Sequence, residues 1–257
     1  MMNKLYFIAF FTILRRELKR FLRTWPQSLL PSVINMALYF VIFGQILGST
    51  IGTVEGMPYI KYIAPGLIMM AIINNSYTNV VFSLYLMRFS KSIEELLVAP
   101  IPNTLILSAL VTGGIIRAFL IAVLVTIIAL FFTHLHIHSI TITFATAFLT
   151  ALLFSLAGFL NALFARRFDD TAIIPTFVLT PLNYLGGIFY SINLLPGIWH
   201  TIALCNPILY MINAFRYGLL GITDVSLSTA FISLIACNIV LLGINLYLLN
   251  RGTGIRP

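Results

Sequence analysis

Six stretches of this chain are apolar and long enough to cross a lipid bilayer as helices: residues 28–48, 60–87, 104–132, 140–164, 172–190 and 226–249. Crossing takes roughly 20 helical residues, because the hydrocarbon layer is about 30 Å thick. Hydrophobic residues make up 60% of the 257-residue chain and charged residues 9%, whereas about 25% of the residues of a soluble domain are charged. The sequence therefore excludes a soluble domain and predicts an all-α, polytopic membrane protein with six transmembrane helices.

The loops between these stretches differ in charge. With six spans, twelve of the 15 basic residues fall on one side of the membrane: Lys4, Arg15, Arg16, Lys19, Arg20, Arg23, Arg88, Lys91, Arg166, Arg167, Arg251 and Arg256. Cytoplasmic loops carry an excess of lysine and arginine, so both termini are predicted to be cytoplasmic.

A further apolar stretch, residues 194–221, is interrupted by Pro196-Gly197 and Asn206-Pro207. These interruptions favour two short helices that dip into the edge of the bilayer over one continuous helix.

The N-terminal segment, residues 4–25, has the pattern of an amphipathic helix at the membrane surface. Its apolar face is formed by Leu14, Leu18, Phe21, Leu22 and Trp25. The remaining surface carries Arg15, Arg16, Lys19, Arg20 and Arg23. Because an apolar face alternates with the basic residues and the first span follows directly, the pattern favours anionic lipid headgroups over nucleic acid. The basic residues are predicted to anchor the helix at the membrane.

Residues 88–102 form a polar island between the second and third spans. Ser92 followed by Glu95 matches a capping box, and Pro100 prevents the helix from continuing, so a helix is predicted over residues 93–99. Its apolar positions recur at i, i+3 and i+4, which are Ile93, Leu96 and Leu97. This spacing leaves two alternatives open: the helix lies flat on the lipid, or it docks to another protein.

The acidic residues bear on how transport could be driven. In the six-span assignment all seven fall in loops or at membrane surfaces: Glu17, Glu55, Glu94, Glu95, Asp169, Asp170 and Asp224. Ion-coupled carriers usually place an ionisable or coordinating group near the middle of the membrane, so an ion-coupled mechanism is disfavoured. The chain has no G-x-x-x-x-G-K-[ST] phosphate loop, so the energy for active transport must come from another chain.

The sequence offers no catalytic or metal site. It contains neither G-x-S-x-G nor H-E-x-x-H, so no intramembrane hydrolase is indicated. The alternating His134, His136 and His138 could share one face of an extended segment, but no acid or cysteine lies near them to complete a metal site.

Polar residues inside the spans are candidates for a transport path or for hydrogen bonds between helices, and for the second span the pattern favours hydrogen bonds between helices. The second span contains the polar run of residues 74–79, and the fifth span is similarly polar. The candidate path residues are Asn74, Asn75, Thr78, Asn183 and Tyr184. Arg117 in the third span could reach the headgroups, pair with Asp169 or Asp170, or contact substrate.

Two motifs resemble the integral-membrane subunits of ABC-2 type ATP-binding-cassette exporters. The first is Glu-Glu-Leu-Leu-Val-Ala-Pro-Ile-Pro at residues 94–102, after the second span. The second consists of Leu-Leu-Pro-Gly-Ile-Trp at 194–199, Asn-Pro-Ile-Leu-Tyr at 206–210 and Phe-Arg-Tyr-Gly at 215–218, before the sixth span. The resemblance implies the type V exporter fold as one domain over residues 1–257. Its parts would be an interfacial helix at 4–25, a coupling-helix loop at 88–102 and an external re-entrant pair at 191–221.

The resemblance also implies a function. The chain would be the non-catalytic permease of an exporter in the bacterial inner membrane, forming a homodimer that binds two cytoplasmic ATPase subunits and membrane lipids, but no nucleic acid. ATP and Mg²⁺ would be bound by the ATPase and no cofactor by this chain. The residues implied to couple the two are Ser92, Ile93, Glu94, Glu95, Leu96, Leu97, Pro100 and Pro102. The substrate would be amphipathic, lipid-linked, glycan or drug-like. The alternatives are a non-transporting scaffold or receptor subunit and an ion-coupled secondary carrier.

Overall fold

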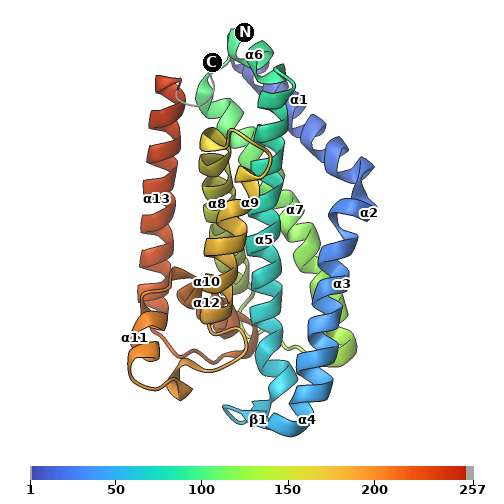
Figure 1. Ribbon diagram of the computed structural model, residues 1–257, viewed down its shortest axis with the longest axis vertical. Helices are drawn as coiled ribbons and strands as arrows, with labels where there is room; N and C mark the ends of the chain where they lie inside the picture. Colours follow the sequence, from blue (N-terminus) through green and yellow to red (C-terminus); the bar gives the residue numbers. More distant parts are fainter. Residues whose placement is uncertain (1, 253–257) are drawn as a thin grey trace.

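The computed structural model describes residues 2–252, without the side chains of Met2, Asn3 and Leu97, and it is almost entirely helical (Figure 1). Its long helices are α1 (Met2–Arg23), α5 (Tyr59–Phe89), α7 (Asn103–Phe132), α8 (Ile140–Phe164) and α13 (Leu227–Arg251). The shorter α-helices are α2 (Trp25–Ser28), α3 (Leu30–Tyr39), α4 (Leu47–Ile51), α6 (Ser92–Val98), α9 (Asp170–Ile174), α10 (Thr180–Leu185), α11 (Ile198–Leu204) and α12 (Pro207–Leu220). Other elements are π-helical segments at Phe40–Ile46 and Pro175–Leu179, a 3-10 turn at Ile192–Leu194, and the two-residue strands β1 (Thr53–Val54) and β2 (Met57–Pro58), which form an antiparallel hairpin.

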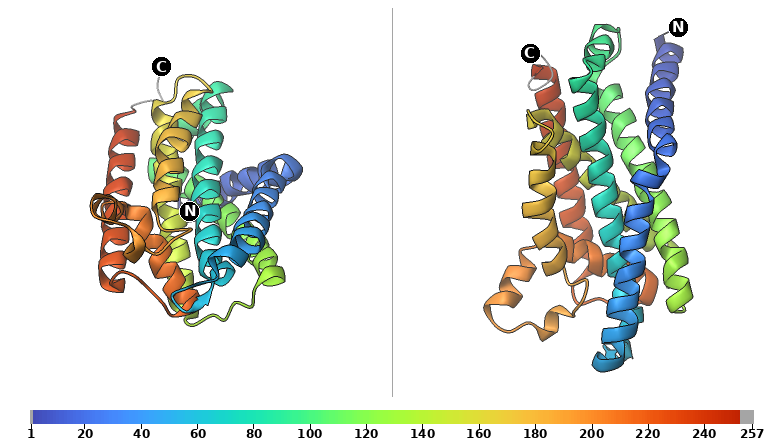
Figure 2. Two further views of the ribbon diagram at one scale, coloured as in Figure 1. Left: turned by 60° about the horizontal axis from the view of Figure 1, so that its bottom comes forward. Right: turned by 45° about the vertical axis from the view of Figure 1, so that its right-hand side comes forward.

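Among residues 2–252, five helical stretches are long and apolar enough to cross a membrane, or six if one bent helix pair is counted as a broken span. The five are Trp25–Ile51, which joins α2, α3 and α4, together with α5, α7, α8 and α13. These agree with five of the six predicted spans, so the prediction of an all-α polytopic membrane protein is confirmed. In Figures 1 and 2 these stretches run roughly along one axis. The start of α1, the end of α13 and α6 all lie at one end of the molecule, and the β-hairpin lies at the other (Figure 1).

The predicted fifth span, residues 172–190, is shorter and less regular than expected. It corresponds to α9, the π-helical segment and α10, which together end at Leu185. Pro175 has no backbone N–H to donate, and the π-helical segment begins at this residue. Gly186 and Gly187 end the helix, and Gly187 has a φ of 73°, a left-handed conformation that glycine adopts without strain.

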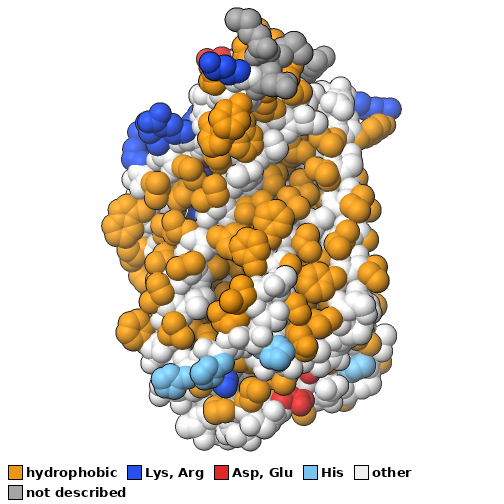
Figure 3. Space-filling model, turned by 180° about the vertical axis from the view of Figure 1, so that it is seen from behind, with side chains coloured by type: hydrophobic (Ala, Val, Ile, Leu, Met, Phe, Trp, Pro, Cys, Tyr) orange, Lys and Arg blue, Asp and Glu red, His pale blue; other side chains and the backbone are white. Residues whose placement is uncertain are grey.

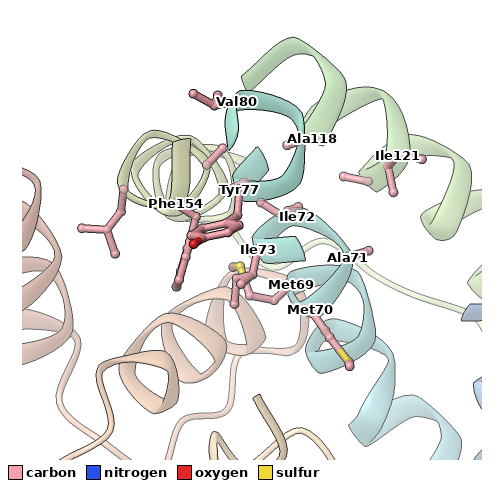
Figure 4. Close-up of a cluster of buried hydrophobic side chains, with 14 of the residues drawn as sticks. Met69, Met70, Ala71, Ile72, Ile73, Tyr77, Val80, Ala118, Ile121 and Phe154 are labelled. Atoms are coloured by element: carbon pink, nitrogen blue, oxygen red, sulfur yellow. The ribbon is translucent and has the colours of Figure 1, made fainter. Parts of the chain in front are cut away.

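Helix α5 lies at the centre of the bundle and packs mainly against α7 and α8. Glycines allow this close approach: a Cβ at Gly114 of α7 would come within 2.6 Å of the side chain of Val80, and one at Gly158 of α8 within 2.5 Å of the carbonyl oxygen of Tyr77. Figure 4 shows Tyr77 beside Phe154 of α8 in the apolar core. Small residues at helix contacts are the usual means of close packing inside membranes, because lipid supplies no hydrophobic force between helices.

The predicted break between two short helices is present. Helices α11 and α12 meet at 77°, and Figure 1 places both at the end of the molecule away from the termini. Asn206 caps α12, because its Oδ1 accepts a hydrogen bond from the backbone N–H of Ile208 at 3.0 Å, and Pro207 occupies the first turn. The side chain of Asn206 also donates to the Leu182 carbonyl oxygen at 2.7 Å, which ties the bend to α10.

The long sides of the molecule are largely apolar. Figure 3 shows a broad field of hydrophobic side chains on one side, with lysine and arginine near the upper end and histidine near the lower end. Large exposed apolar residues occur on every spanning stretch, including Phe131 at 84% exposure and Phe144 at 60%. An exposed apolar area of this extent matches a lipid environment rather than water.

Candidate functional site

Helix α6 projects at the end of the molecule where the termini lie (Figure 1), as the polar island predicted, but it begins in a different way. The predicted capping box is wrong: the N-cap is Lys91, in the left-handed conformation with φ of 57°, and it makes no side-chain cap. Ser92 is instead the first helical residue. Its hydroxyl lies 3.0 Å from the hydroxyl of Ser90 and accepts a hydrogen bond from Arg16 of α1 at 2.9 Å. Ser92 therefore connects α6 to α1 through Arg16, and it does not cap the first turn of α6.

Two of the three residues of the predicted apolar stripe of α6 pack against the bundle. Ile93 is 2% exposed and Leu96 packs beside it against the core of the chain itself, so the expectation that these two residues face outward is wrong. The side chain of Leu97 lies outside the described residues. The outer surface is formed by Glu94, Glu95 and Val98, and Val98 is 87% exposed. Pro100 follows the helix, and Pro102 is the N-cap of α7.

Arg88, at the end of α5, joins the base of α6 to α8. Its guanidinium donates to the carbonyl oxygens of Ala162, Leu163 and Ala165, the last at 2.9 Å. These are among the carbonyls that the end of a helix leaves without a partner, and a cation there also interacts favourably with the helix dipole. Helix α6 is thus connected to α1 through Ser92 and, by way of the end of α5 that carries Arg88, to α8.

The loop between α8 and α9 lies beside this connection. The carboxylate of Asp170 accepts hydrogen bonds from the backbone N–H groups of Arg166 and Arg167, each at 2.8 Å. These hydrogen bonds hold the pKa of Asp170 below its ordinary value of 3.8, so the carboxylate is charged at neutral pH. The charged carboxylate keeps the two arginines in a tight turn.

Three of the candidate path residues meet along one seam of the bundle. The amide of Asn183 in α10 donates to Oδ1 of Asn74 in α5 at 3.2 Å, and the hydroxyls of Tyr184 and Tyr39 lie 3.0 Å apart. Tyr184 is 41% exposed and Asn74 is half-buried. We call this group, Tyr39, Asn74, Asn183 and Tyr184, the tyrosine seam. It joins α3, α5 and α10.

Aromatic rings continue the tyrosine seam toward the end away from the termini. The ring centroids of Phe189 lie 6.0 Å from Tyr39, 6.0 Å from Tyr184 and 4.4 Å from Phe43. Sequence reasoning missed Tyr39, Phe43 and Phe189. Their sequence signal is weak, since aromatic residues make up 13% of the chain and their spacing does not show which of them meet.

The other two candidate path residues have different environments. Thr78 is half-buried and its hydroxyl donates to the Asn74 carbonyl oxygen one turn earlier, at 2.7 Å. Asn75 is 3% exposed and its Oδ1 accepts from Ser32 at 3.2 Å and from Arg117 at 3.4 Å. Asn75 therefore joins helices within the bundle.

Arg117 does not pair with Asp169 or Asp170, so that alternative is wrong. Arg117 is 9% exposed, and its guanidinium donates to the Ser28 carbonyl oxygen at 2.8 Å, to Asn75 and to Asn79. The first span passes close to α7 at α2, which brings the Ser28 carbonyl within reach. The partners come from two segments, α2 and α5, that are far from Arg117 in sequence, and this is why the spacing of residues could not identify them.

The N-terminal helix α1 has the predicted division of faces only in part. Leu14 and Phe21 are buried, whereas Leu22 and Trp25 are exposed. Buried with them is Glu17, 1% exposed and paired with Arg20 at 2.9 Å, although the sequence suggested that it lies at the surface. The basic residues Arg15, Arg16, Lys19 and Arg23 are exposed, as predicted. In Figure 1, α1 slants away from the bundle toward α2.

A second buried arginine lies near the C-terminal end of α12. Arg216 is 1% exposed, donates to the Gly187 carbonyl oxygen at 2.6 Å and lies 4.0 Å from the ring centre of Tyr62. Its guanidinium is 3.9 Å from the carboxylate of Asp224. These contacts fix α12 and the loop before α13 against α5. Within residues 2–252 no group of histidine, cysteine and acidic residues is arranged to hold a metal ion.

Spanning helices, a projecting helix at the basic end and a bent helix pair at the other end define a membrane transport subunit. The ABC-2 type transporter family matches residues 8–220, and the chain belongs to this family. It is therefore a non-catalytic, multi-pass transport subunit whose family implies a partner ATP-binding subunit.

The chain is 49% identical to the inner membrane transport permease YadH of Escherichia coli K12 over 255 residues, which cover 99% of this chain and 100% of the relative. It is 23% identical to nodulation protein J of Rhizobium leguminosarum bv. viciae over 202 residues, covering 77% of this chain and 78% of the relative. The first relative and the apolar spans place the chain in the inner membrane.

Proposed function

We propose that this chain is the permease of an ATP-driven exporter, with the end that carries α6 and both termini in the cytoplasm. The observation that carries the proposal is α6 itself. It projects from the bundle with an outer surface of two acids and an exposed valine, while Ile93 anchors it to the core. A short helix anchored on one side and exposed on the other is suited to pass a movement from a bound protein to the spans.

The connections of α6 support this role. A displacement of α6 acts on α1 through the hydrogen bond between Arg16 and Ser92, and on α8 through Arg88 at the end of α5. The ATP and Mg²⁺ needed to drive the movement belong to the ATP-binding subunit. This chain contributes the coupling surface, formed by Glu94, Glu95 and Val98, with Leu97 in the same helix and Pro100 and Pro102 defining the loop.

We further propose that two copies of the chain form the transport path, each with one ATP-binding subunit. The tyrosine seam supports this arrangement, because polar and half-exposed side chains within the spanning region are costly against lipid and favourable against water or protein. A second copy facing the seam would enclose a path lined by Asn74, Thr78 and Tyr184, whereas Asn183 is 1% exposed and supports the seam from within the bundle. Two identical chains meeting on a twofold axis are the simplest symmetric assembly.

The rings of Tyr39, Tyr184 and Phe189 provide flat apolar surfaces beside hydroxyl and amide groups. Such surfaces suit an amphipathic, lipid-linked, glycan or drug-like substrate with both apolar faces and hydroxyl groups. The basic face of α1 supports anchoring to anionic lipid headgroups, and the bent pair α11 and α12 is the external re-entrant segment of this proposal.

The test replaces Val98 with aspartate in the full-length chain, co-expressed with its ATP-binding subunit. A charge in an apolar contact costs about 2 kcal/mol or more, so association should weaken roughly thirtyfold and ATP hydrolysis should no longer respond to lipids, glycans or drugs supplied to the reconstituted complex. Glu94→Lys should have a smaller effect, as expected for a charge at the rim of an interface.

The matched control is Thr104→Asp, which introduces the same charge at an exposed position of α7 near the same end. It should bind the ATP-binding subunit as the unmodified chain does. Unchanged association and unchanged stimulation in Val98→Asp, with the protein correctly inserted, would leave α6 as a helix that rests on the lipid surface. Association without hydrolysis or transport under any condition would indicate a scaffold instead.

A further inference from the structure

We propose that the junction of α1, α5 and α7 is a binding site for a phosphate group, carried by a lipid headgroup or by soluble phosphate. The site is formed by Arg20, Asn79 and Arg117, and we call it the arginine junction. It is separate from the coupling surface of α6 and from the tyrosine seam. It stands independently of the proposed function, because binding of a phosphate group can be measured with this chain alone.

Two cations share one oxygen atom at the arginine junction. The Nη2 of Arg20 and the Nη1 of Arg117 donate to the same Oδ1 of Asn79, at 3.1 and 3.4 Å. Within residues 2–252, Arg20 has one carboxylate partner, Glu17 at 2.9 Å, and Arg117 has none. Two guanidinium groups and one carboxylate leave a net positive charge in a buried place, where electrostatic repulsion is weakly screened.

The fully buried side-chain atoms of this junction that lack a hydrogen-bond partner are all donors. Within residues 2–252, the Nε atoms of Arg20 and Arg117 and the Nδ2 of Asn79 are buried and donate to no protein group. Asn79 is fully buried and Arg117 is 9% exposed. The acceptor oxygens Oδ1 of Asn79 and Oε2 of Glu17 already receive hydrogen bonds. A site with spare donors and spare positive charge is complementary to an anion with several acceptor oxygens, and phosphate is such an anion.

Arg20 is the member of the junction that is accessible from the membrane surface. Its side chain is 29% exposed, and together with Arg15, Arg16, Lys19 and Arg23 it forms an open basic surface along α1. A phosphate group drawn to this basic surface meets Arg20, whereas Arg117 is buried behind it. Leu22 and Trp25 are exposed close by in sequence, which places apolar surface for acyl chains next to the cationic groups.

Binding can be followed with a tryptophan of the chain. The chain has two tryptophans, Trp25 and Trp199, and Trp25 directly follows α1. In the Trp199→Phe variant, Trp25 reports on this region alone. The full-length chain in uncharged maltoside micelles is titrated with phosphatidylglycerol, with a galactolipid that has the same acyl chains but no phosphate, and with inorganic phosphate. Fluorescence and the midpoint of thermal unfolding are recorded.

Phosphatidylglycerol should give a saturable change that the galactolipid does not give. Arg117→Gln should weaken this binding roughly tenfold, as expected for loss of a charge-assisted hydrogen bond. Arg251→Gln is the matched control, because Arg251 is exposed at the end of α13, and it should bind normally.

Competition by inorganic phosphate would identify soluble phosphate as a ligand, and no competition would restrict the site to headgroups. Both of these results support the site.

Asn79→Asp is the decisive variant, because it supplies a carboxylate between the two arginines from within the chain. It should raise the midpoint of thermal unfolding in the absence of lipid and remove the response to phosphatidylglycerol. The proposal is overturned if phosphatidylglycerol and the galactolipid bind equally. It is also overturned if Asn79→Asp still responds to phosphatidylglycerol as the unmodified chain does, since the spare donors would then be satisfied by water.

Discussion

Glycine determines how closely the central helices approach each other. A Cβ at Gly158 would lie 2.5 Å from the backbone oxygen of Tyr77, and backbone cannot move aside as the end of a side chain can. In contrast, a Cβ at Gly243 of α13 would meet no heavy atom within 4 Å. The two positions therefore differ in packing while sharing a helical backbone.

Gly158→Ala should destabilise the protein by about 1–3 kcal/mol, because one added methyl group overpacks a close helix contact. Gly243→Ala should be neutral or slightly stabilising, since alanine is the better helix former. Thermal unfolding of both variants in the same detergent measures the difference. Equal unfolding midpoints would show that α5 and α8 can separate without cost.

Single residues inside the spans were also where sequence reasoning reached its limit. The sequence showed that Arg117 lies in a span, but its partners Ser28, Asn75 and Asn79 belong to other helices, and only the packing of those helices brings them together. Arg216 was not recognised as a buried residue. A signal was present, since Asn213 precedes it by one helical turn in an otherwise apolar segment.

At the scale of elements, the apolar stretches predicted the spans well because length and hydrophobicity alone suffice to define a helix in lipid. The interruptions at Pro196-Gly197 and Asn206-Pro207 predicted the bend between short helices for the same local reason. The capping box failed because it depends on backbone conformation: Lys91 adopts a left-handed conformation that a spacing of serine and glutamate does not reveal. The burial of Ile93 in the core of the chain could not be predicted either. An apolar stripe shows that a helix has a covered face, but it does not show whether the same chain, lipid or another protein covers it.

The end of α8 depends on Arg88, which lies at the end of α5. Arg88→Gln should loosen the last turn of α8, because its carbonyl groups lose a cationic donor. Hydrogen exchange of the amides at residues 161–165 should become faster, while exchange in the middle of α8 stays the same. Arg23→Gln removes an exposed arginine of α1 and is the control. Unchanged exchange at 161–165 in Arg88→Gln would mean that water replaces the side chain fully.

At the scale of the whole molecule, the two ends differ in charge and in architecture. Basic residues, α6 and the described ends of α1 and α13 gather at one end, whereas the β-hairpin and the bend between α11 and α12 lie at the other. The excess of basic residues predicts that the first end faces the cytoplasm. The native cysteines allow a test of this orientation without adding a probe, because Cys205 is exposed at the bend between α11 and α12.

Cys205 should react with a membrane-impermeant maleimide added from the outer side of the membrane in spheroplasts. The second cysteine, Cys237, lies within α13 and is partly buried, so it should react little, and Cys205→Ser should therefore abolish most of the labelling. A single cysteine introduced at Ser90, in the turn before α6, should in turn be labelled only after the membrane is opened, in a background where Cys205 and Cys237 are replaced. Labelling of the cysteine at position 90 from outside, together with no labelling of Cys205 in the unmodified chain, would reverse the orientation. It would also remove α6 from the compartment that contains ATP, and a coupling role for this helix would then be impossible.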